Sequence, residues 1–204
     1  MLWHEIFGIE QNIDALFSPT HIVLALGIVL ILSAPLRAAW AADPLNPAPS
    51  YRELLPVTLS LSLVTTLVAF MFMYFGAFSY AENVPTVAER QAFASSGNSS
   101  FWSLSVIAAF LVTTFFLLAP LLLAHRRWHL PFGFATTLFT LLAVLTGAIA
   151  EYALPERILA AAIAGVAVDL LGRALRPATG GRSFWIFGLV APTALWTVDL
   201  GCSR

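Results

Sequence analysis

Residues 55–78 read LPVTLSLSLVTTLVAFMFMYFGAF, a run that contains no charged side chain. The hydrocarbon core of a bilayer is about 30 Å thick, and an α-helix needs about 20 apolar residues to cross it. This run is long enough to do so. It predicts a transmembrane helix over Leu55–Phe78.

Apolar stretches of the same kind recur before and after this run, separated by connections rich in Pro, Gly, Ser and Asn at 43–50 and 82–100. We predict further spans at His21–Ala39, Phe101–Ala124, Leu130–Ala150, Pro155–Leu171 and Phe184–Leu200. Proline at a helix start sacrifices no hydrogen bond, so Pro19, Pro56 and Pro131 are expected in first turns. The predicted fold is all-α, an integral membrane bundle of about six transmembrane helices (21–204) after an amphipathic outer-face segment (1–20).

The composition agrees with a membrane protein. Of the 204 residues, 59% are hydrophobic and 10% are charged, whereas soluble domains are about half apolar and a quarter charged. This excludes a soluble globule. The net charge is −1 and no basic stripe is interleaved with aromatic residues, so nucleic acid is not an expected partner. The single Cys202 cannot form a disulfide within one chain.

The arginines predict the orientation, because cytoplasmic loops carry the excess of positive charge. The loops after the first, third and fifth spans hold Arg37, Arg52, Arg126, Arg127, Arg173, Arg176 and Arg182. The other loops and the C-terminus hold Arg90, Arg157 and Arg204. The first set is therefore expected in the cytoplasm of a bacterium, with the chain multi-pass in its inner membrane. MLWHEIFGIE lacks the pattern of a signal peptide, so insertion should rely on the internal helices.

Residues 3–27, WHEIFGIEQNIDALFSPTHIVLALG, contain the candidate metal ligands. Ser18 is a good N-cap and Pro19 a good first helical residue, which places His21 in the first turn of the first span. The positive end of the helix dipole favours the neutral imidazole there, which is the form that binds metal. His21 and His4, with Glu10 or Asp14, would suit copper, zinc or iron. The alternative is that both histidines are interfacial polar residues.

Trp3-His4, Glu10 and the run SPTHIV at 18–23 resemble the metal-site signature of the C subunit of the copper membrane monooxygenases, the particulate methane and ammonia monooxygenase family. The resemblance implies that His4 and His21 are the histidine ligands, that Glu10 stands at an acidic position, that copper is the cofactor and that other membrane subunits are partners. The interval between the histidines is longer here than in that family. The family's aspartate, which precedes the first histidine, would fall before Met1.

Three acidic residues support a different function. Glu151 and Asp199 end the fourth and sixth spans, and Asp169 interrupts the fifth, so they could line the polar path of a small transporter or channel component. The alternative for Glu151 and Asp199 is solvation at the interface. For Asp169 we expect an i,i+4 ion pair with Arg173. A membrane subunit with a purely structural role is the third possibility.

Two further patterns have structural interpretations. His125 and His129 have the spacing of a metal pair, but the adjoining arginines and Pro131 favour a tight turn at the inner face. Ala161 and Gly165 form a small-xxx-small face, which predicts close packing of the fifth span against a neighbouring helix.

Overall fold

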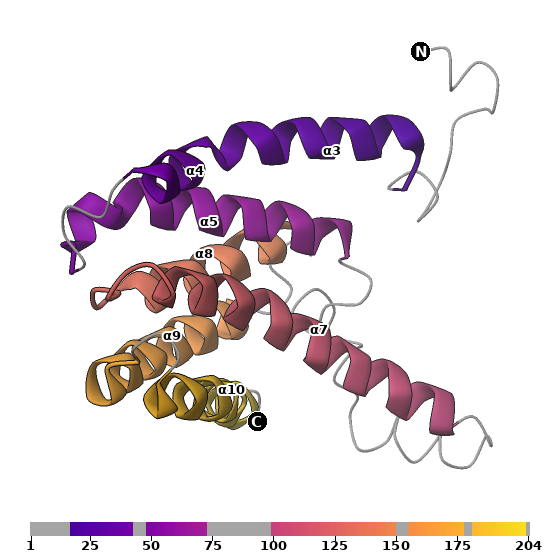
Figure 1. The fold of residues 1–204 in the computed structure, drawn as a ribbon. Coiled ribbons are helices and arrows are strands. Elements are labelled where there is room, and N and C mark those ends of the chain that lie inside the picture. Colours follow the sequence, from indigo (N-terminus) through magenta and orange to yellow (C-terminus); the bar gives the residue numbers. More distant parts are fainter. Residues whose placement is uncertain (1–16, 43–47, 73–98, 150–154, 178–180, 203–204) are drawn as a thin grey trace.

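The computed structural model describes residues 17–42, 48–72, 99–149, 155–177 and 181–202. This part of the chain is all-helical and contains no strand, which confirms the predicted fold class (Figure 1). The helices are α3 (Pro19–Leu32), α4 (Ala34–Ala41), α5 (Tyr51–Met71), α7 (Ser99–His125), α8 (Phe134–Ile149), α9 (Pro155–Leu175) and α10 (Arg182–Cys202).

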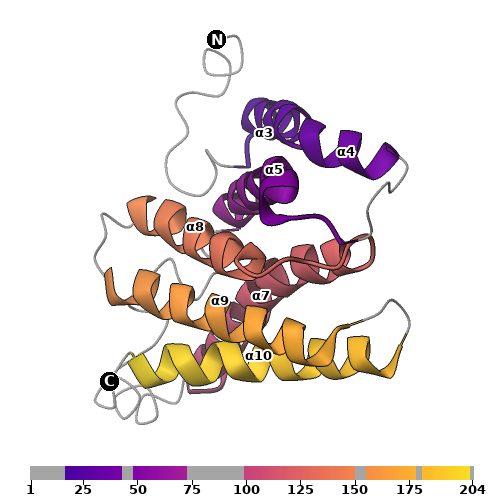
Figure 2. The same cartoon turned by 90° about the vertical axis from the view of Figure 1, so that its left-hand side faces the viewer.

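The helices stack side by side in the order α3, α5, α8, α9 and α10, as Figure 2 shows. The most extensive packing joins α8 with α9, α9 with α10, and α5 with α8. Helix α7 also packs on α5, α8 and α10. The centre of the core holds large side chains that are almost fully buried, namely Phe134, Phe139, Phe187, Leu117, Leu121 and Leu195.

Helix α5 begins earlier than predicted, at Tyr51 instead of Leu55. Ser50 caps it through a capping box, in which the Ser50 hydroxyl accepts from the amide of Glu53 while the Glu53 carboxylate accepts from the amide of Ser50. Pro56 is consequently inside the helix, not in its first turn. Pro131 also lies outside its expected place, because it precedes α8 and accepts a hydrogen bond from the amide of Phe134.

The predicted first span is broken at Ser33, where α3 and α4 are bent by 46° relative to each other. Pro35 on the α4 side has no amide proton to continue the hydrogen-bond ladder. Side chains instead satisfy the carbonyls at the end of α3. Those of Ser33 and Arg37 donate to the Leu30 carbonyl at 3.2 and 2.8 Å, and Ser60 on α5 donates to that of Leu32.

The buried polar and exposed apolar side chains of α5 are compatible with a lipid environment. Ser and Thr side chains are buried on its inner side: Thr58, Ser60, Ser62, Thr65 and Thr66. Thr58, Ser62 and Thr66 donate to carbonyls one turn earlier in the same helix. Leu55 and Leu59 are exposed. Exposed apolar residues also cover other helices: Val23, Leu26 and Ile31 on α3, Ile107, Leu111 and Phe115 on α7, and Trp185 and Leu189 on α10.

By length and composition, α5 and residues Glu156–Leu175 of α9 are each able to cross a membrane, and α3 with α4 would be a third span if the bent pair is counted as one. The apolar parts of α7 and α8 described here are shorter. The helices are thus compatible with a membrane protein. The number of six spans stays a prediction.

Candidate functional site

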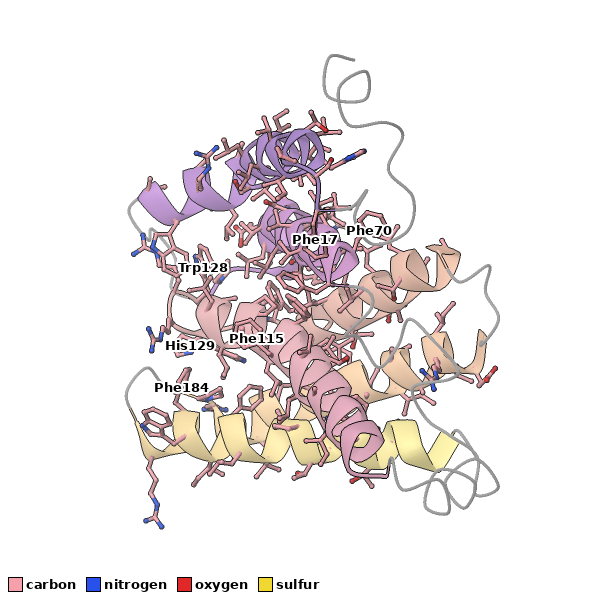
Figure 3. The ribbon with its side chains drawn as sticks, turned by 90° about the vertical axis from the view of Figure 1, so that its right-hand side faces the viewer. Phe17, Phe70, Phe115, Trp128, His129 and Phe184 are labelled. Atoms are coloured by element: carbon pink, nitrogen blue, oxygen red, sulfur yellow. The ribbon has the colours of Figure 1, made fainter. Side chains whose placement is uncertain are left out.

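The ends of α4, α7 and α9 and the starts of α5, α8 and α10 lie toward one end of the bundle (Figures 1 and 2). Arg127, after α7, donates to the carbonyl of Ala42 at the end of α4, and the rings of Trp40 and Trp128 are 5.6 Å apart. At the opposite end Phe17, before α3, meets Phe72, after α5, with ring centroids 6.5 Å apart. In Figure 3 Trp128, His129 and Phe184 lie toward the first end and Phe17 and Phe70 toward the other. The seven arginines predicted to face the cytoplasm lie on the segments that meet at the first end: Arg37, Arg52, Arg126, Arg127, Arg173, Arg176 and Arg182.

Asp169 on α9 caps α8 at this end. Its carboxylate is buried and accepts hydrogen bonds from the amides of Gly133, Ala135 and Thr136 at 2.9–3.0 Å, and from the Thr136 hydroxyl at 2.6 Å. These amides belong to the start of a helix, where they have no partner within the helix. The negative charge is also favourable beside the positive end of the α8 dipole. Asp169 therefore fastens α9 to α8.

Two glycines allow this close approach. A Cβ on Gly165 would lie 2.5 Å from the Thr136 Cα, closer than real structures allow, so only glycine fits there. This agrees with the predicted small-residue face on α9. Gly133, directly before α8, has a φ of 98°, a conformation that residues with side chains rarely adopt. Tyr51 packs against Gly133, and its hydroxyl shares a 2.6 Å hydrogen bond with Thr137.

The predicted ion pair between Asp169 and Arg173 is wrong. The Asp169 carboxylate is directed at the amides of α8, and the Arg173 guanidinium instead lies 4.5 Å from the centroid of the Phe132 ring. An i,i+4 spacing allows such a pair but does not impose it. The four hydrogen bonds also give Asp169 a structural role.

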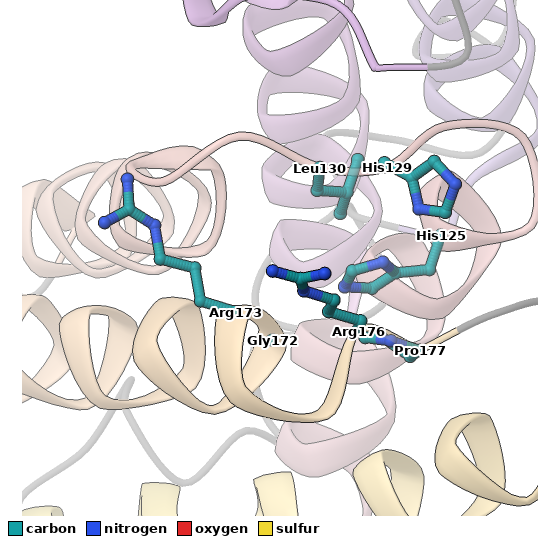
Figure 4. Close-up of a pocket in the computed structure, with 7 residues that line it drawn as sticks. All are labelled: His125, His129, Leu130, Gly172, Arg173, Arg176 and Pro177. Carbon is teal, nitrogen blue, oxygen red and sulfur yellow. The ribbon is translucent and has the colours of Figure 1, made fainter.

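Next to this junction is a cavity of about 560 Å³ between the ends of α7 and α9 (Figure 4). It is lined by His125, His129, Leu130, Gly172, Arg173, Arg176 and Pro177, and we call it the cationic cavity. Four of these seven residues are Arg or His and none is acidic. Two separate segments supply the basic side chains, since His125 and His129 flank the turn after α7 while Arg173 and Arg176 lie at the end of α9.

His125 and Arg176 are unusual within this cavity. His125 follows the predicted span Phe101–Ala124 and is 8% exposed, and its Nδ1 has no hydrogen-bond partner among the described residues. Burial and, secondarily, the nearby His129 lower the pKa of His125 to about 4, so its imidazole is neutral at pH 7. Arg176 directly follows α9 and has a φ of 43°, in the left-handed region where glycine is the usual residue after a helix.

His21 lies at the other end of the bundle, as predicted for the first turn of α3. Ser18 caps the helix, Pro19 is its first residue, and the Ser18 hydroxyl is 2.7 Å from His21 Nδ1. His4, Glu10, Asp14 and Glu151 lie outside the described residues, as does the side chain of Asp199. Among the residues that are described, no group of three His, Cys, Asp or Glu side chains could hold a metal ion. The described part of the chain thus supplies one candidate copper ligand, His21.

No protein-family model, no curated protein and no solved structure matches the chain. The fold therefore defines the class of protein, which is an all-helical bundle whose apolar helices are compatible with a bilayer.

The sequence interpretation overlooked the cationic cavity as a site. It assigned residues 125–129 to a turn and Arg173 to an ion pair with Asp169. Each of these explanations considered a single segment of the chain. The available signal was the abundance of basic residues in two loops that the same orientation places at one end of the bundle. Only the packing of α7 on α10, which itself packs on α9, brings His125 and Arg176 to one cavity.

Proposed function

We propose that this chain is a multi-pass protein of a bacterial inner membrane that holds copper at its outer face through His21 and His4, with Glu10 or Asp14 as a further ligand. As the resemblance to the C subunit of copper membrane monooxygenases implies, it would act as one subunit beside other membrane subunits. The observation that carries the proposal is the contact between Ser18 and His21.

The contact matters because it involves one of the two ring nitrogens of His21 and so bears on which nitrogen is left to bind a metal. Ser18 Oγ and His21 Nδ1 are 2.7 Å apart, and Ser18 is itself buried. Where Nδ1 donates its proton to Oγ, Nε2 carries the lone pair that a metal requires. Ligating histidines usually have such a hydrogen bond at the other ring nitrogen, which fixes their tautomer and orientation. In that tautomer Ser18 would hold His21 as a metal-binding imidazole, which supports the proposal.

The membrane placement is supported by the distribution of side chains. Helix α3, which holds His21, buries none of its residues, and Val23, Leu24 and Ile31 on it are more than half exposed. Such a surface is unfavourable in water and favourable in lipid. The helix start with Ser18, Thr20 and His21 is its polar end. His21 would accordingly lie at an interface, where a second histidine on the preceding segment can approach it.

Of the three acidic residues considered for a transport path, Asp169 is the one whose side chain is described. Its carboxylate accepts hydrogen bonds from the amides of α8, so this contact favours a structural role and not the transporter alternative.

The copper content of the purified full-length chain tests the proposal. The protein in detergent would be loaded with copper, freed of loosely bound metal and analysed for copper per chain. We expect stoichiometric copper in the unmodified protein and its loss in His21→Ala and in His4→Ala. Ser18→Ala should weaken the affinity by about tenfold, because it removes only the support of the ligand.

His129→Ala is the matched control, since it removes an exposed histidine at the opposite end of the bundle. Its copper content should equal that of the unmodified chain. Helical content by circular dichroism would establish that each variant is folded. Copper that persists in both His21→Ala and His4→Ala would refute the site.

A further inference from the structure

The lining of the cationic cavity includes two arginines and no carboxylate to offset their positive charge. Arg173 and Arg176 are both exposed and line it together with the exposed His129, while no acidic side chain lines it. The nearest carboxylate on α9, that of Asp169, is buried against α8 and accepts four hydrogen bonds there. The cavity is therefore suited to an anion.

The donors favour phosphate among anions. A guanidinium presents a planar fork of N–H groups that matches the oxygens of a phosphate, and imidazoles provide further donors. The buried Nδ1 of His125 has no partner among the described residues, and a buried polar atom of this kind is normally hydrogen-bonded. An anion in the cavity would supply partners for several of these groups.

The backbone conformation of Arg176 is a separate indication that the cavity is a binding site. A side chain at a left-handed position is strained relative to glycine, and such outliers are concentrated at functional sites. Its amide closes α9 by donating to the Gly172 carbonyl at 2.9 Å, and Pro177 then ends the helix. Any residue could make that backbone bond, and glycine would make it without strain. The chain nevertheless has an arginine at this position, where its side chain lines the cavity.

The surface beside the cavity is apolar. Leu159, Ile163, Val166 and Leu170 are exposed and follow one another at intervals of three or four residues, so they form a single stripe along α9. Arg173 continues this spacing three residues after Leu170. A molecule with hydrocarbon chains along the stripe would thus place its polar end at the cavity.

We propose that the cationic cavity binds the phosphate group of an anionic phospholipid whose acyl chains lie along the α9 stripe. Its volume of about 560 Å³ is far larger than a phosphate ion and accommodates a glycerol-linked headgroup. Basic pockets between helices on the cytoplasmic side commonly take such headgroups. The inference rests on the bundle lying in a bilayer but is independent of the copper site, which is at the opposite end.

The test uses the full-length protein in a neutral detergent and measures its midpoint of thermal unfolding during titration with phosphatidylglycerol, phosphatidylcholine or inorganic phosphate. We expect phosphatidylglycerol to raise the midpoint at lower concentration than phosphatidylcholine does, and inorganic phosphate to have little effect. The double variant Arg173→Gln/Arg176→Gln should bind phosphatidylglycerol more weakly by about fivefold for each arginine removed. Copper content, measured in parallel, should not change.

The matched control is Arg52→Gln/Arg182→Gln, which removes two exposed positive charges from the same end of the bundle but outside the cavity. It should retain the affinity for phosphatidylglycerol. An equal loss in both double variants would overturn the proposal, because general electrostatic attraction would then explain the binding. If inorganic phosphate stabilised the protein as much as phosphatidylglycerol does, the proposal of a lipid as the occupant would be overturned. Should the first double variant fail to fold, Arg173→Gln and Arg176→Gln would be measured singly, each with the same expected loss.

Discussion

The carboxylate of Asp169 accepts hydrogen bonds from both the amide and the hydroxyl of Thr136, at 3.0 and 2.6 Å. One residue near the end of α9 thus fixes the first turn of α8, and it does so away from water. Hydrogen bonds to a buried charge contribute more than neutral ones, and removal of the charge leaves amides without a partner. The junction of α8 and α9 should therefore be the most sensitive part of the bundle to substitution.

The first prediction is that Asp169→Asn destabilises the fold by about 2–4 kcal/mol. An asparagine has one acceptor oxygen instead of two, and its NH₂ group would face amides that also donate. Unfolding of the detergent-solubilised protein, followed by circular dichroism, measures the change. Arg173→Gln serves as the comparison and should cost less than about 1 kcal/mol, because that guanidinium lies exposed over the Phe132 ring.

Exchange of the charges at positions 169 and 173 distinguishes the role of Asp169 as a cap of α8 from the ion pair with Arg173 that the i,i+4 spacing indicated. The variant Asp169→Arg/Arg173→Asp should be as unstable as Asp169→Arg alone, since the carboxylate at 173 would not face the start of α8. Recovery of stability in the double variant would contradict the role of Asp169 as a cap.

The second prediction concerns Gly165 and Gly27, two helical glycines in opposite surroundings. A Cβ at Gly165 would collide with the backbone of Thr136, whereas a Cβ at Gly27 would meet nothing within 4 Å. Gly165→Ala should destabilise the protein by about 1–3 kcal/mol through separation of α8 from α9. Gly27→Ala should be neutral or stabilise it by up to about 1 kcal/mol, because alanine is the better helix former. Equal effects in the same unfolding assay would exclude close packing as the reason for Gly165.

Local patterns in the sequence were sufficient to predict those features of the fold that depend only on neighbouring residues. Ser18, Pro19 and His21 occupy the cap, the first position and the first turn of α3 as predicted. The start of α5 was missed because the apolar run begins later than the helix. Its capping box, Ser50 and Glu53, is a local signal that an interpretation based on hydropathy passes over.

Features that depend on contacts between distant segments could not be predicted in the same way. The amides that donate to Asp169 belong to the start of another helix, α8. Along α9 itself, Arg173 was the only partner that the sequence suggested for Asp169. Likewise the cationic cavity combines His125 with Arg176, which are far apart in the sequence. The proposed copper ligands His4, Glu10 and Asp14 stay predictions, as they lie outside the described residues.

The third prediction contrasts two buried serines of α5. Ser60 donates to the Leu32 carbonyl of another helix, whereas Ser62 donates to the Thr58 carbonyl of its own helix. Ser60→Ala should cost about 1 kcal/mol, because a carbonyl at the broken end of α3 loses its partner. Ser62→Ala should cost less, because a carbonyl inside a helix already accepts from the backbone. The order of the two unfolding midpoints checks this, and the reverse order would show that Ser60 does not stabilise the end of α3.

The last prediction is the orientation in the membrane. Seven arginines gather at the end of the bundle that includes Ala48, and three belong to the other loops and the C-terminus, so Ala48 should face the cytoplasm and Thr20 the outside. Both positions are exposed, and the native Cys202 would first be replaced by Ala. In intact cells a membrane-impermeant thiol reagent should label Thr20→Cys and should label Ala48→Cys only after permeabilisation. If only Ala48→Cys were labelled in intact cells, the orientation would be the opposite of the one predicted. His21 would then lie at the inner face and the cationic cavity at the outer one, so this single measurement bears on the placement of both proposed sites.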